Sequence, residues 1–417
     1  MKVIDYIIQN IEVIKQQRED EEEERYFRKY AHIFDLTYVF FSKNKVLLYG
    51  GTALNELMPK NLKIYKEHTL PDIDVFSIDA YNLAVKLVKY FHRKGFDNIT
   101  TSYTEALHEG TYKVFVDSIQ VADITDVTKK TFKRLSENSV LSKSLNINIV
   151  NPQVLRMSMH LILSKGDSDS VSRWEKNLKR LYALYKVYPP VACKSQSGAS
   201  PTSKVVVSSL RHALKERDYV LLGMHEVELM LGKAISFADI PPIQVLVENS
   251  DLKQVANNII SRAKTFLSVS ATSTKSTPTS TNTSTLTCSN VYKADHFIPE
   301  HICIKSNGKI VAIIYYADDC VNYNEYKGAR IASIHTIIRI YLSMLLSPYK
   351  HFEKFANSCE CVATMLSIIN QQSHKPNNKM QIKNKLLKDV VEKCYGSYNG
   401  IVTMRKDRLQ RIANKNK

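Results

Sequence analysis

The chain has 417 residues, 44% of them hydrophobic, which is enough to bury a sizeable core in two domains of ordinary size with helical additions. The formal net charge of +17 favours a polyanionic partner, because clustered Lys and Arg gain free energy by displacing counterions from phosphates. RNA, DNA or an acidic membrane surface fits that description. No apolar run approaches the roughly 20 residues that span a bilayer, so we expect a soluble, cytoplasmic protein without a membrane segment.

The cysteines do not predict a metal or redox site. The chain has seven, an odd number, and none forms a CxxC pair. We therefore expect reduced and mostly buried thiols, as is usual in the cytosol.

Residues 1–45 predict two helices ahead of the first domain. Isoleucines recur at helical spacing near the start, and an acidic run at residues 20–24 leads into a second stretch with helical periodicity. The isoleucines are Ile4, Ile7, Ile8, Ile11 and Ile14. The acidic run is most simply a solvated helix face.

Residues 46–190 predict an α/β domain with a mixed sheet. Up to Val127, β-rich runs alternate with helical stretches: LLYGG and IDVFS, a helix near residues 81–92, then YKVFV and IQVADI. A helical region at residues 153–188 completes this domain.

Ser- and Thr-rich stretches are the main compositional feature of the second half of the chain. A domain at residues 205–350 contains a Ser/Thr-rich tract at 268–290, and another Ser-rich stretch precedes it at 194–203. Such sequence buries too little apolar surface to offset its ordering entropy, so we expect the longer tract to be a mobile loop. Residues 351–417 predict a helical, basic C-terminal region.

A glycine pair marks the first candidate site. In LLYGGTALNELM an apolar strand runs through Gly50 and Gly51 into a helix that opens at Thr52. Glycines let the backbone approach a phosphate closely, and the helix start offers unpaired N–H groups and the positive end of a dipole. Such a pair by itself is more often a plain turn, so phosphate binding needs support from other residues.

Two aspartates follow on the next predicted strand. Asp72 and Asp74, in LPDIDVFS, lie two residues apart, so both carboxylates project from one face of the strand. Carboxylates without a basic neighbour repel each other unless a divalent cation lies between them. The alternative is a pair of solvated acids on a surface strand.

A third carboxylate lies on a later strand. Asp123, in IQVADIT, sits between apolar neighbours, where an acid without a partner is costly. Asp117 and Asp126 compete for this role, but the first falls in a turn and the second at the end of the strand. We therefore predict that the carboxylates of Asp72, Asp74 and Asp123 converge.

A glycine pair, paired aspartates and a lone later aspartate form the pattern of polymerase β-type nucleotidyltransferases, which the chain resembles. The resemblance implies phosphoryl transfer with two Mg²⁺ or Mn²⁺ ions, one bridging all three aspartates and one held by Asp72 and Asp74. Thr52 and the amides of Gly50 and Gly51 would hold the β- and γ-phosphates. The segment from Gly51 to Asp72 is longer than in most of the superfamily, which predicts an inserted loop whose lysines lie near the substrate.

Further motifs are similar to poly(A) polymerases of large cytoplasmic DNA viruses: YGGTALNELMP, LPDIDVFS, HEGTYKVFV, VADITDV, LRMSMHLILS, SRWEKNLKRL and CYGSYNG. This resemblance implies an enzyme that adds adenylates from ATP to an RNA 3′ end, as a homodimer, in the host cytoplasm or a viral factory, with packaging in the virion also compatible. GGTAL with DID occurs in toxin-type nucleotidyltransferases as well, which modify tRNA or protein. The other alternative is a non-catalytic RNA-binding or processivity subunit, although three intact acids count against it.

The second half repeats the first in weakened form. VLLGMHEVELM resembles LLYGGTALNELM, IPPIQVLVE resembles LPDIDVFSI, and KIVAIIYY resembles IQVADITD. In this register the three acids become Pro242, Gln244 and Ile313, and Gly51 becomes Met224. The sequence thus predicts an α/β fold of two duplicated nucleotidyltransferase-like mixed-sheet domains with flanking helices, an active N-terminal copy and a degenerate C-terminal scaffold. Chance similarity of two α/β segments is the alternative.

Basic residues complete the predicted site. Four of them are predicted to bind triphosphate or RNA, with a solvated helix face as the alternative: Arg156, Lys176, Lys179 and Arg180. Trp174 is expected in the core rather than as a base-stacking platform, and His108 either near the primer or in a structural role.

Overall fold

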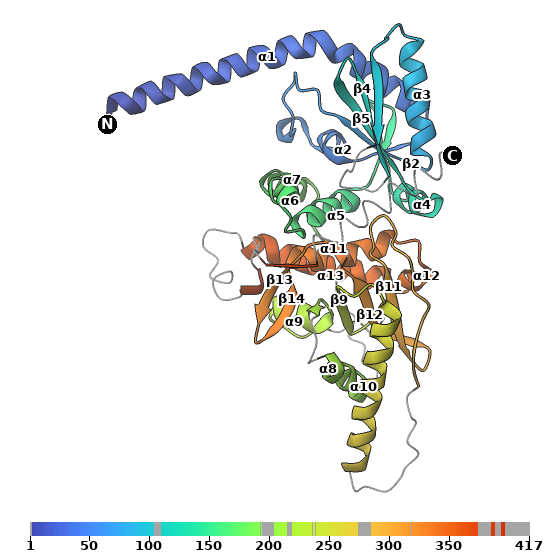
Figure 1. Ribbon diagram of the computed structural model, residues 1–417. Coiled ribbons are helices and arrows are strands. Elements are labelled where there is room, and N and C mark those ends of the chain that lie inside the picture. The colour runs from blue at the N-terminus through green and yellow to red at the C-terminus, as the bar shows by residue number, and fades with distance from the viewer. Residues whose placement is uncertain are drawn as a thin grey trace. The chain divides into compact units, whose positions relative to one another are not determined.

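The chain divides into two compact units, Met1–Leu155 and Arg156–Lys417, each built around one sheet (Figure 1). The computed structural model describes residues 2–103, 110–191, 193, 204–214, 219–235, 237, 239–273, 285–317, 319–373, 385–387 and 393–396. The narrower domain limits taken from the sequence, 46–190 and 205–350, stay predictions.

Lys2–Ser42 forms one continuous helix, α1, so the prediction of two helices is wrong. No glycine or proline interrupts residues 15–28, and ion pairs about one turn apart join charged side chains there, such as Lys15 with Glu19 at 3.9 Å. The isoleucines near the start do lie on a helix, and their side chains are exposed.

The first unit builds a seven-stranded sheet in the order β3-β4-β5-β2-β1-β7-β6. Strands β2 and β5 run parallel and side by side, which brings together the two segments that carry the predicted aspartates. The strands predicted at IDVFS, YKVFV and IQVADI are confirmed. The elements are β1 (Leu47–Leu48), α2 (Gly50–Leu57), η1 (Lys60–Leu62), β2 (Ile73–Ser77), α3 (Ala80–His92), β3 (Ile99–Tyr103), β4 (Thr111–Val116), β5 (Ile119–Asp126), α4 (Lys129–Ser136), β6 (Val140–Ser142) and β7 (Ile147–Ile149), and the unit ends within α5 (Pro152–Leu163).

The second unit builds an eight-stranded sheet in the order β10-β11-β12-β9-β8-β14-β13-β15. Most of α5 lies in this unit and precedes its first strand. The helices α6 (Ser168–Val171), α7 (Trp174–Val187) and α8 (Lys204–Leu214) follow it. The next elements are β8 (Val220–Leu221), α9 (Met224–Leu231), β9 (Ile243–Val247), α10 (Leu252–Ser273), β10 (Leu286–Cys288), β11 (His301–Ser306), β12 (Lys309–Tyr316), β13 (Val321–Tyr326), β14 (Ala329–Ala332) and α11 (Ile334–Leu346). The described part ends with α12 (Lys350–Glu353), α13 (Ala356–Ser373), η2 (Lys385–Leu387) and β15 (Cys394–Tyr395).

The two sheets share one topology, which confirms the duplicated fold. Apart from β15, the strand orders coincide when β1 is matched with β8, and every matched pair of strands has the same relative direction. The hairpins β4–β5 and β11–β12 carry a bulge at the same point, after Val114 and after Ile304. Both turn through two residues of positive φ, 117–118 and 307–308. Chance similarity of two α/β segments does not account for a shared bulge and turn.

Helices cover both faces of the second sheet (Figure 1). On one face α8 and α10 pack against alternate residues of β9, β11 and β12, including Val245, Ile304 and Ile314. On the other face α11 and α13 pack against each other. Across the described ranges, the structure holds no helix that combines the length and the apolar character needed to cross a membrane.

Two expectations about the second unit are wrong in part. The prediction of a mobile loop over 268–290 is wrong at both ends of the tract, since α10 continues to Ser273 and β10 begins at Leu286, and extending a helix adds one hydrogen bond per residue without a new nucleus. Residues 274–284 lie outside the described residues. Cysteines 193 with 361 and 320 with 394 form disulfides, because their Cα atoms lie 5.6 and 5.3 Å apart, within the span of such a bond. Three other predicted features lie outside the described residues: His108, the stretch 194–203 and the basic segment after residue 396.

Candidate active site

The first functional element is the junction between β1 and α2. The N–H of Tyr49, at the end of β1, donates to the carbonyl of Asp74 at 2.9 Å, and the chain then enters α2 through Gly50. Gly50 has a φ of +70°, and a Cβ added there would lie 2.0 Å from Oδ2 of Asp74. Only glycine fits this position, because both the left-handed backbone and the nearby carboxylate exclude a side chain.

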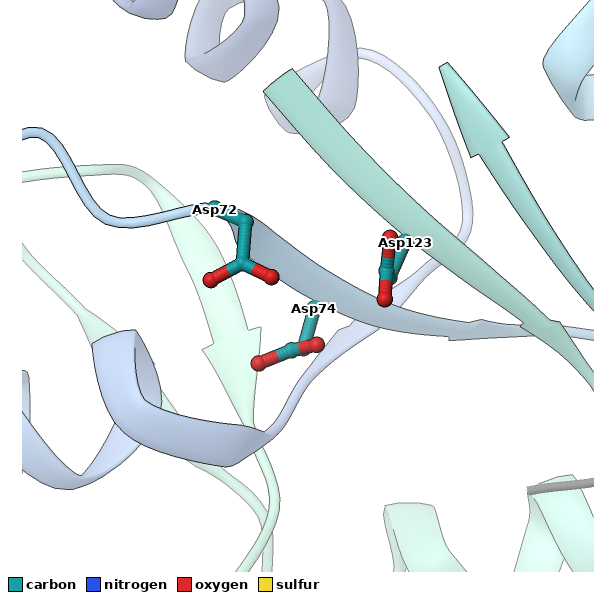
Figure 2. A group of neighbouring side chains, drawn as sticks. All are labelled: Asp72, Asp74 and Asp123. Atoms are coloured by element: carbon teal, nitrogen blue, oxygen red, sulfur yellow. The ribbon is translucent and has the colours of Figure 1, made fainter. Parts of the chain in front are cut away.

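The three predicted aspartates converge at this junction. Asp72 lies immediately before β2, Asp74 on β2 and Asp123 on β5, and the three carboxylates lie side by side (Figure 2). Asp74 and Asp123 are direct neighbours across the two parallel strands, and one oxygen from each of the three carboxylates lies within 4.8 Å of the others. Asp123 is buried, whereas Asp72 and Asp74 are half-buried. The arrangement is an acidic cluster open to solvent on one side.

Two polar side chains that the sequence did not single out hold the cluster together. The amide of Gln120 donates to Oδ2 of Asp72 at 3.0 Å and to Oδ1 of Asp123 at 2.8 Å. The ammonium of Lys113 lies 2.7 Å from Oδ2 of Asp123, so the acids do have a basic neighbour, contrary to the sequence argument. Gln120 and Lys113 thus reduce the repulsion among the carboxylates and fix two of them in place.

The bulge in the β4–β5 hairpin explains why these partners were missed. Phe115 pairs with Gln120 and Val114 pairs with Ala122, so residue 121 of β5 is left over. An extra residue breaks the strict alternation of a strand, which places Gln120 on the same side as Asp123. A regular hairpin with this turn would have set Lys113 opposite residue 122 instead.

The side chain of Tyr49 lies close to the acids, against a second aromatic ring. The ring of Tyr49 stacks on Phe76 with centroids 3.9 Å apart, and its hydroxyl lies 2.8 Å from Oγ1 of Thr125. Burial, and then the nearby Asp74, raise the pKa of Tyr49 well above its usual range. The phenol therefore stays protonated at neutral pH and serves as a fixed hydrogen-bonding group beneath the cluster.

The donor set fits a hard divalent cation. Three carboxylates at this spacing supply the oxygen ligands that Mg²⁺ and Mn²⁺ take. Without a cation, three negative charges within 4.8 Å of one another repel, and Lys113 offsets only part of that charge. Asp72, Asp74 and Asp123 are thus the residues suited to hold such ions.

Other residues of the first unit that were predicted to lie near the substrate make contacts within the chain. The hydroxyl of Thr52 donates to the carbonyl of Asp72 at 3.1 Å, which ties the start of α2 to the start of β2. In the inserted loop, Lys66 lies 2.6 Å from Asp20 of α1, and Lys63 donates to the carbonyl of Asn55 at 2.6 Å. Phosphate binding by Gly50, Gly51 and Thr52 stays a prediction.

The predicted basic residues belong to the second unit. Arg156 is buried, and its guanidinium donates to the carbonyl of Tyr188 at 2.7 Å. The same group makes a cation–π contact with the ring of Tyr185. Lys176, Lys179 and Arg180 lie on α7, where Lys179 pairs with Glu175 at 2.5 Å. Their roles toward triphosphate or RNA stay predictions. Trp174 is half-buried rather than in the core as expected, and its indole N–H donates to the carbonyls of Ile162 and Lys165.

The counterpart of the acidic cluster in the second unit contains no acid at the three matched positions. Leu222 donates to the carbonyl of Gln244 at 3.0 Å, as Tyr49 does to Asp74, and Gln244 neighbours Ile313 across β9 and β12. The register inferred from the sequence is therefore correct. The buried amide of Gln244 donates to the hydroxyl of Tyr341 at 3.0 Å and accepts from that of Tyr315 at 3.1 Å.

The helix start of the second copy is occupied by a side chain of the same helix. Glu226, the third residue of α9, is buried, and one carboxylate oxygen lies 3.2 Å from where a Cβ on Gly223 would be. Burial raises the pKa of Glu226 to about 7, while backbone N–H groups of residues 226 and 223 act in the opposite direction. An acid at this position caps the helix and closes the place that Gly50 leaves open in the first unit.

Comparison with known proteins agrees with the resemblance inferred from the motifs. The family model described as "Poly(A) polymerase catalytic subunit" matches residues 35–168. A putative poly(A) polymerase catalytic subunit of African swine fever virus (isolate Pig/Kenya/KEN-50/1950) is 31% identical over 156 residues, which cover 36% of this chain and 32% of the relative. One from Acanthamoeba polyphaga mimivirus is 29% identical over 154 residues, covering 36% and 25%. The matched segments span a third or less of these relatives.

A solved structure extends the likeness to nearly the whole chain. The crystal structure of the Megavirus polyadenylate synthase matches with a TM-score of 0.73 at 19% identity, covering 99% of this chain and 83% of that one. At this identity the match establishes the fold, in both units.

Proposed function

We propose that the chain is a template-independent nucleotidyltransferase that adds adenylates from ATP to the 3′ end of RNA. The observation that carries the proposal is the convergence of Asp72, Asp74 and Asp123 beside a glycine-lined helix start, with one oxygen of each within 4.8 Å of the others. The match of residues 35–168 to the poly(A) polymerase family model supports the choice of reaction. The net charge of +17 suits a polyanionic substrate.

The residues of the site have separable tasks. Asp72, Asp74 and Asp123 would hold Mg²⁺ or Mn²⁺, and ions held there would lower the pKa of the primer 3′-hydroxyl and neutralise charge on the leaving pyrophosphate. Gln120 orients Asp72 and Asp123, and the N–H groups at the start of α2, next to Gly50, bind the β- and γ-phosphates. These groups are fixed before substrate arrives, so little reorganisation accompanies the reaction.

Several finer assignments belong to the same proposal. Arg156, Lys176 and Arg180 are assigned to the triphosphate or the RNA backbone. Self-association into a homodimer and action in the cytoplasm of an infected cell are proposed from the resemblance of the motifs to viral poly(A) polymerases. The RNA 3′ end and ATP are the substrates, and no membrane takes part.

A primer-extension assay tests the function. The chain is incubated with a labelled oligo(A) primer, Mg²⁺ or Mn²⁺, and each of the four nucleotides in turn. We expect a ladder of products with ATP only, which disappears in Asp72→Ala and persists in Asp97→Ala, an exposed acid of the same unit.

The other outcomes separate the alternatives. Transfer of a single residue to tRNA or to a protein would favour the toxin-type enzyme. Binding of oligo(A) with no product under any of these conditions would favour the non-catalytic subunit. Equal ladders with all four nucleotides would contradict the assignment of ATP as the substrate.

A further inference from the structure

A cavity of about 630 Å³ lies in the second unit beside the β11–β12 hairpin. Lys305 and Lys309 line it from the hairpin, Lys350 and Lys354 from α12 and the residue that ends it, and Tyr292 and Tyr349 from the connecting segments. The size falls within the roughly 300–1,000 Å³ typical of sites for small molecules and single nucleotides.

The cavity is strongly basic. Among the described residues, none of its four lysines forms an ion pair with a carboxylate. One carboxylate lines it, that of Asp239, and both of its oxygens accept from the hydroxyl of Ser358, at 2.7 and 2.8 Å. Four ammonium groups around one cavity repel one another, so a bound anion gains their attraction without breaking an existing ion pair.

Aromatic rings form the other part of its wall. Tyr292 lies 5.2 Å from Tyr349 and 4.4 Å from His351 between ring centroids, and the hydroxyl of Tyr349 donates to the carbonyl of Lys293 at 2.5 Å. Burial lowers the pKa of His351 to about 4, with a smaller contribution from the charge of Lys305. The histidine is therefore neutral at physiological pH and adds aromatic surface rather than charge.

The position of the cavity in the duplicated fold is informative. Ile310 lines the cavity. This residue pairs with Lys305 across the β11–β12 hairpin, as Gln120 pairs with Phe115 in the first unit. The cavity thus lies at the edge that, in the first unit, carries the acidic cluster. Phosphates approach the first site only if cations offset its acids, whereas the lysines of the second attract phosphates directly.

We propose that this cavity binds one nucleotide of a single-stranded RNA, with the phosphates on the lysines and the base against the Tyr292 and Tyr349 rings. Unpaired lysines beside fixed aromatic faces are the combination by which proteins hold single strands without reading sequence. The identity of the strand as the substrate rests on the proposed function; the binding itself does not. The degenerate copy then binds the RNA directly and is not only a structural scaffold.

Fluorescence anisotropy of a labelled 12-nucleotide oligo(A) tests the proposal, using the full chain without metal or ATP. We expect Lys309→Gln/Lys354→Gln to weaken binding about tenfold and to reduce the slope of log affinity against log salt by roughly 1.4, since each lost phosphate contact contributes roughly 0.7. Tyr292→Leu is expected to weaken binding on the order of tenfold through lost stacking, with little change in the salt slope.

Matched controls keep the result specific. Lys253→Gln/Lys293→Gln removes two exposed charges of the same unit that do not line the cavity, and it should bind oligo(A) like the wild type within about twofold. Wild-type affinity in both cavity variants would overturn the proposal. Displacement of the labelled probe from the wild type by free ATP, with no displacement by unlabelled oligo(A), would overturn the assignment to RNA in favour of a free nucleotide.

The two proposals fail in different ways. If the chain extends no primer yet the cavity variants still lose oligo(A) binding, the function is wrong and the binding site stands. If primers are extended normally and the cavity variants bind oligo(A) like the wild type, the proposed function stands and the binding site is wrong.

Discussion

In the first unit, the three carboxylates of the cluster lie just before β2, on β2 and on β5, and the second unit has Pro242, Gln244 and Ile313 at the matched positions of the same topology. Two of these carboxylates have polar partners: Lys113 forms an ion pair with Asp123, and Gln120 donates to Asp72 and Asp123. Gln244 is buried between two tyrosine hydroxyls. One copy therefore keeps a repulsive arrangement, and the other satisfies its polar groups internally.

The difference indicates what the fold itself requires. Since the second copy forms the same sheet without the acids, folding does not depend on them. Mutually repelling carboxylates cost free energy in the absence of a ligand, so their presence in one copy points to function. Four predictions test this contrast, from the largest expected effect to the smallest.

The first concerns the acid on β5. Asp123→Asn keeps the shape of the side chain and removes its charge, so we expect adenylate transfer to fall by about a thousandfold, the rate equivalent of several kcal/mol of lost charge stabilisation. The matched change in the other copy, Ile313→Val, should leave the rate within about twofold. Primer extension at saturating ATP measures both; equal activity of Asp123→Asn and the wild type would remove Asp123 from the site.

The second concerns the helix start. Gly50→Ala would set a Cβ 2.0 Å from Asp74, so Asp74 must move and activity should fall on the order of a hundredfold, as expected for a displacement of about 1 Å. Gly95→Ala is the matched control, because Gly95 also has a positive φ, +86°, but nothing lies within 4 Å of its added Cβ. Both variants should lose about 1–2 kcal/mol of stability from the left-handed backbone. Equal activity in the two would show that the approach of Asp74 is unimportant.

The third concerns Glu226, whose pKa burial raises from 4.5 to about 7 in the folded chain. The folded state holds this proton more tightly than the unfolded state, so the stabilisation is complete below pH 4.5 and is lost as the pH rises toward 7. Glu226→Gln should therefore be about 2–3 kcal/mol more stable than the wild type at pH 8 and nearly equal to it at pH 4.5. Chemical denaturation at the two pH values measures the difference; the same difference at both would contradict the buried acid.

The fourth concerns the polar cluster that replaces the acids in the second copy. Tyr341→Phe removes the acceptor of the Gln244 amide and should cost about 1–3 kcal/mol of stability, the penalty for an unsatisfied buried donor. Tyr326→Phe, at a half-buried position on β13, should cost less than about 0.5 kcal/mol. Thermal unfolding compares them, and equal melting temperatures would mean that Gln244 finds another partner.

Much of the site was readable from the sequence because it depends on regular geometry. The spacing of two residues on one strand fixed Asp72 and Asp74 on a common face, and the apolar neighbours of Asp123 marked it as a buried acid with a purpose. The register of the second copy was readable for the same reason: the apolar alternation of β9 follows that of β2. These inferences needed only the period of a strand and the order of elements.

What the sequence did not reveal depends on departures from regularity. The bulge that turns Gln120 toward Asp123 has no signature in IQVADI, and the same bulge sets Lys113 opposite the acid. The disulfides depend on distances between segments 168 and 74 residues apart, which no local pattern fixes. The continuity of α1 was missed because a change of residue type, from isoleucines to acids, was read as a break although every residue there tolerates a helix.

Binding of Mn²⁺ to the full chain tests the central claim most directly, because it asks whether one copy and not the other holds divalent cations. Free Mn²⁺ is followed by its electron paramagnetic resonance signal during titration of the wild type, Asp74→Asn/Asp123→Asn and Gln244→Leu. We predict that the wild type and Gln244→Leu bind alike and that the double aspartate variant binds at least tenfold more weakly, since it loses two of three charged ligands. Unchanged Mn²⁺ affinity in the double variant would contradict the account.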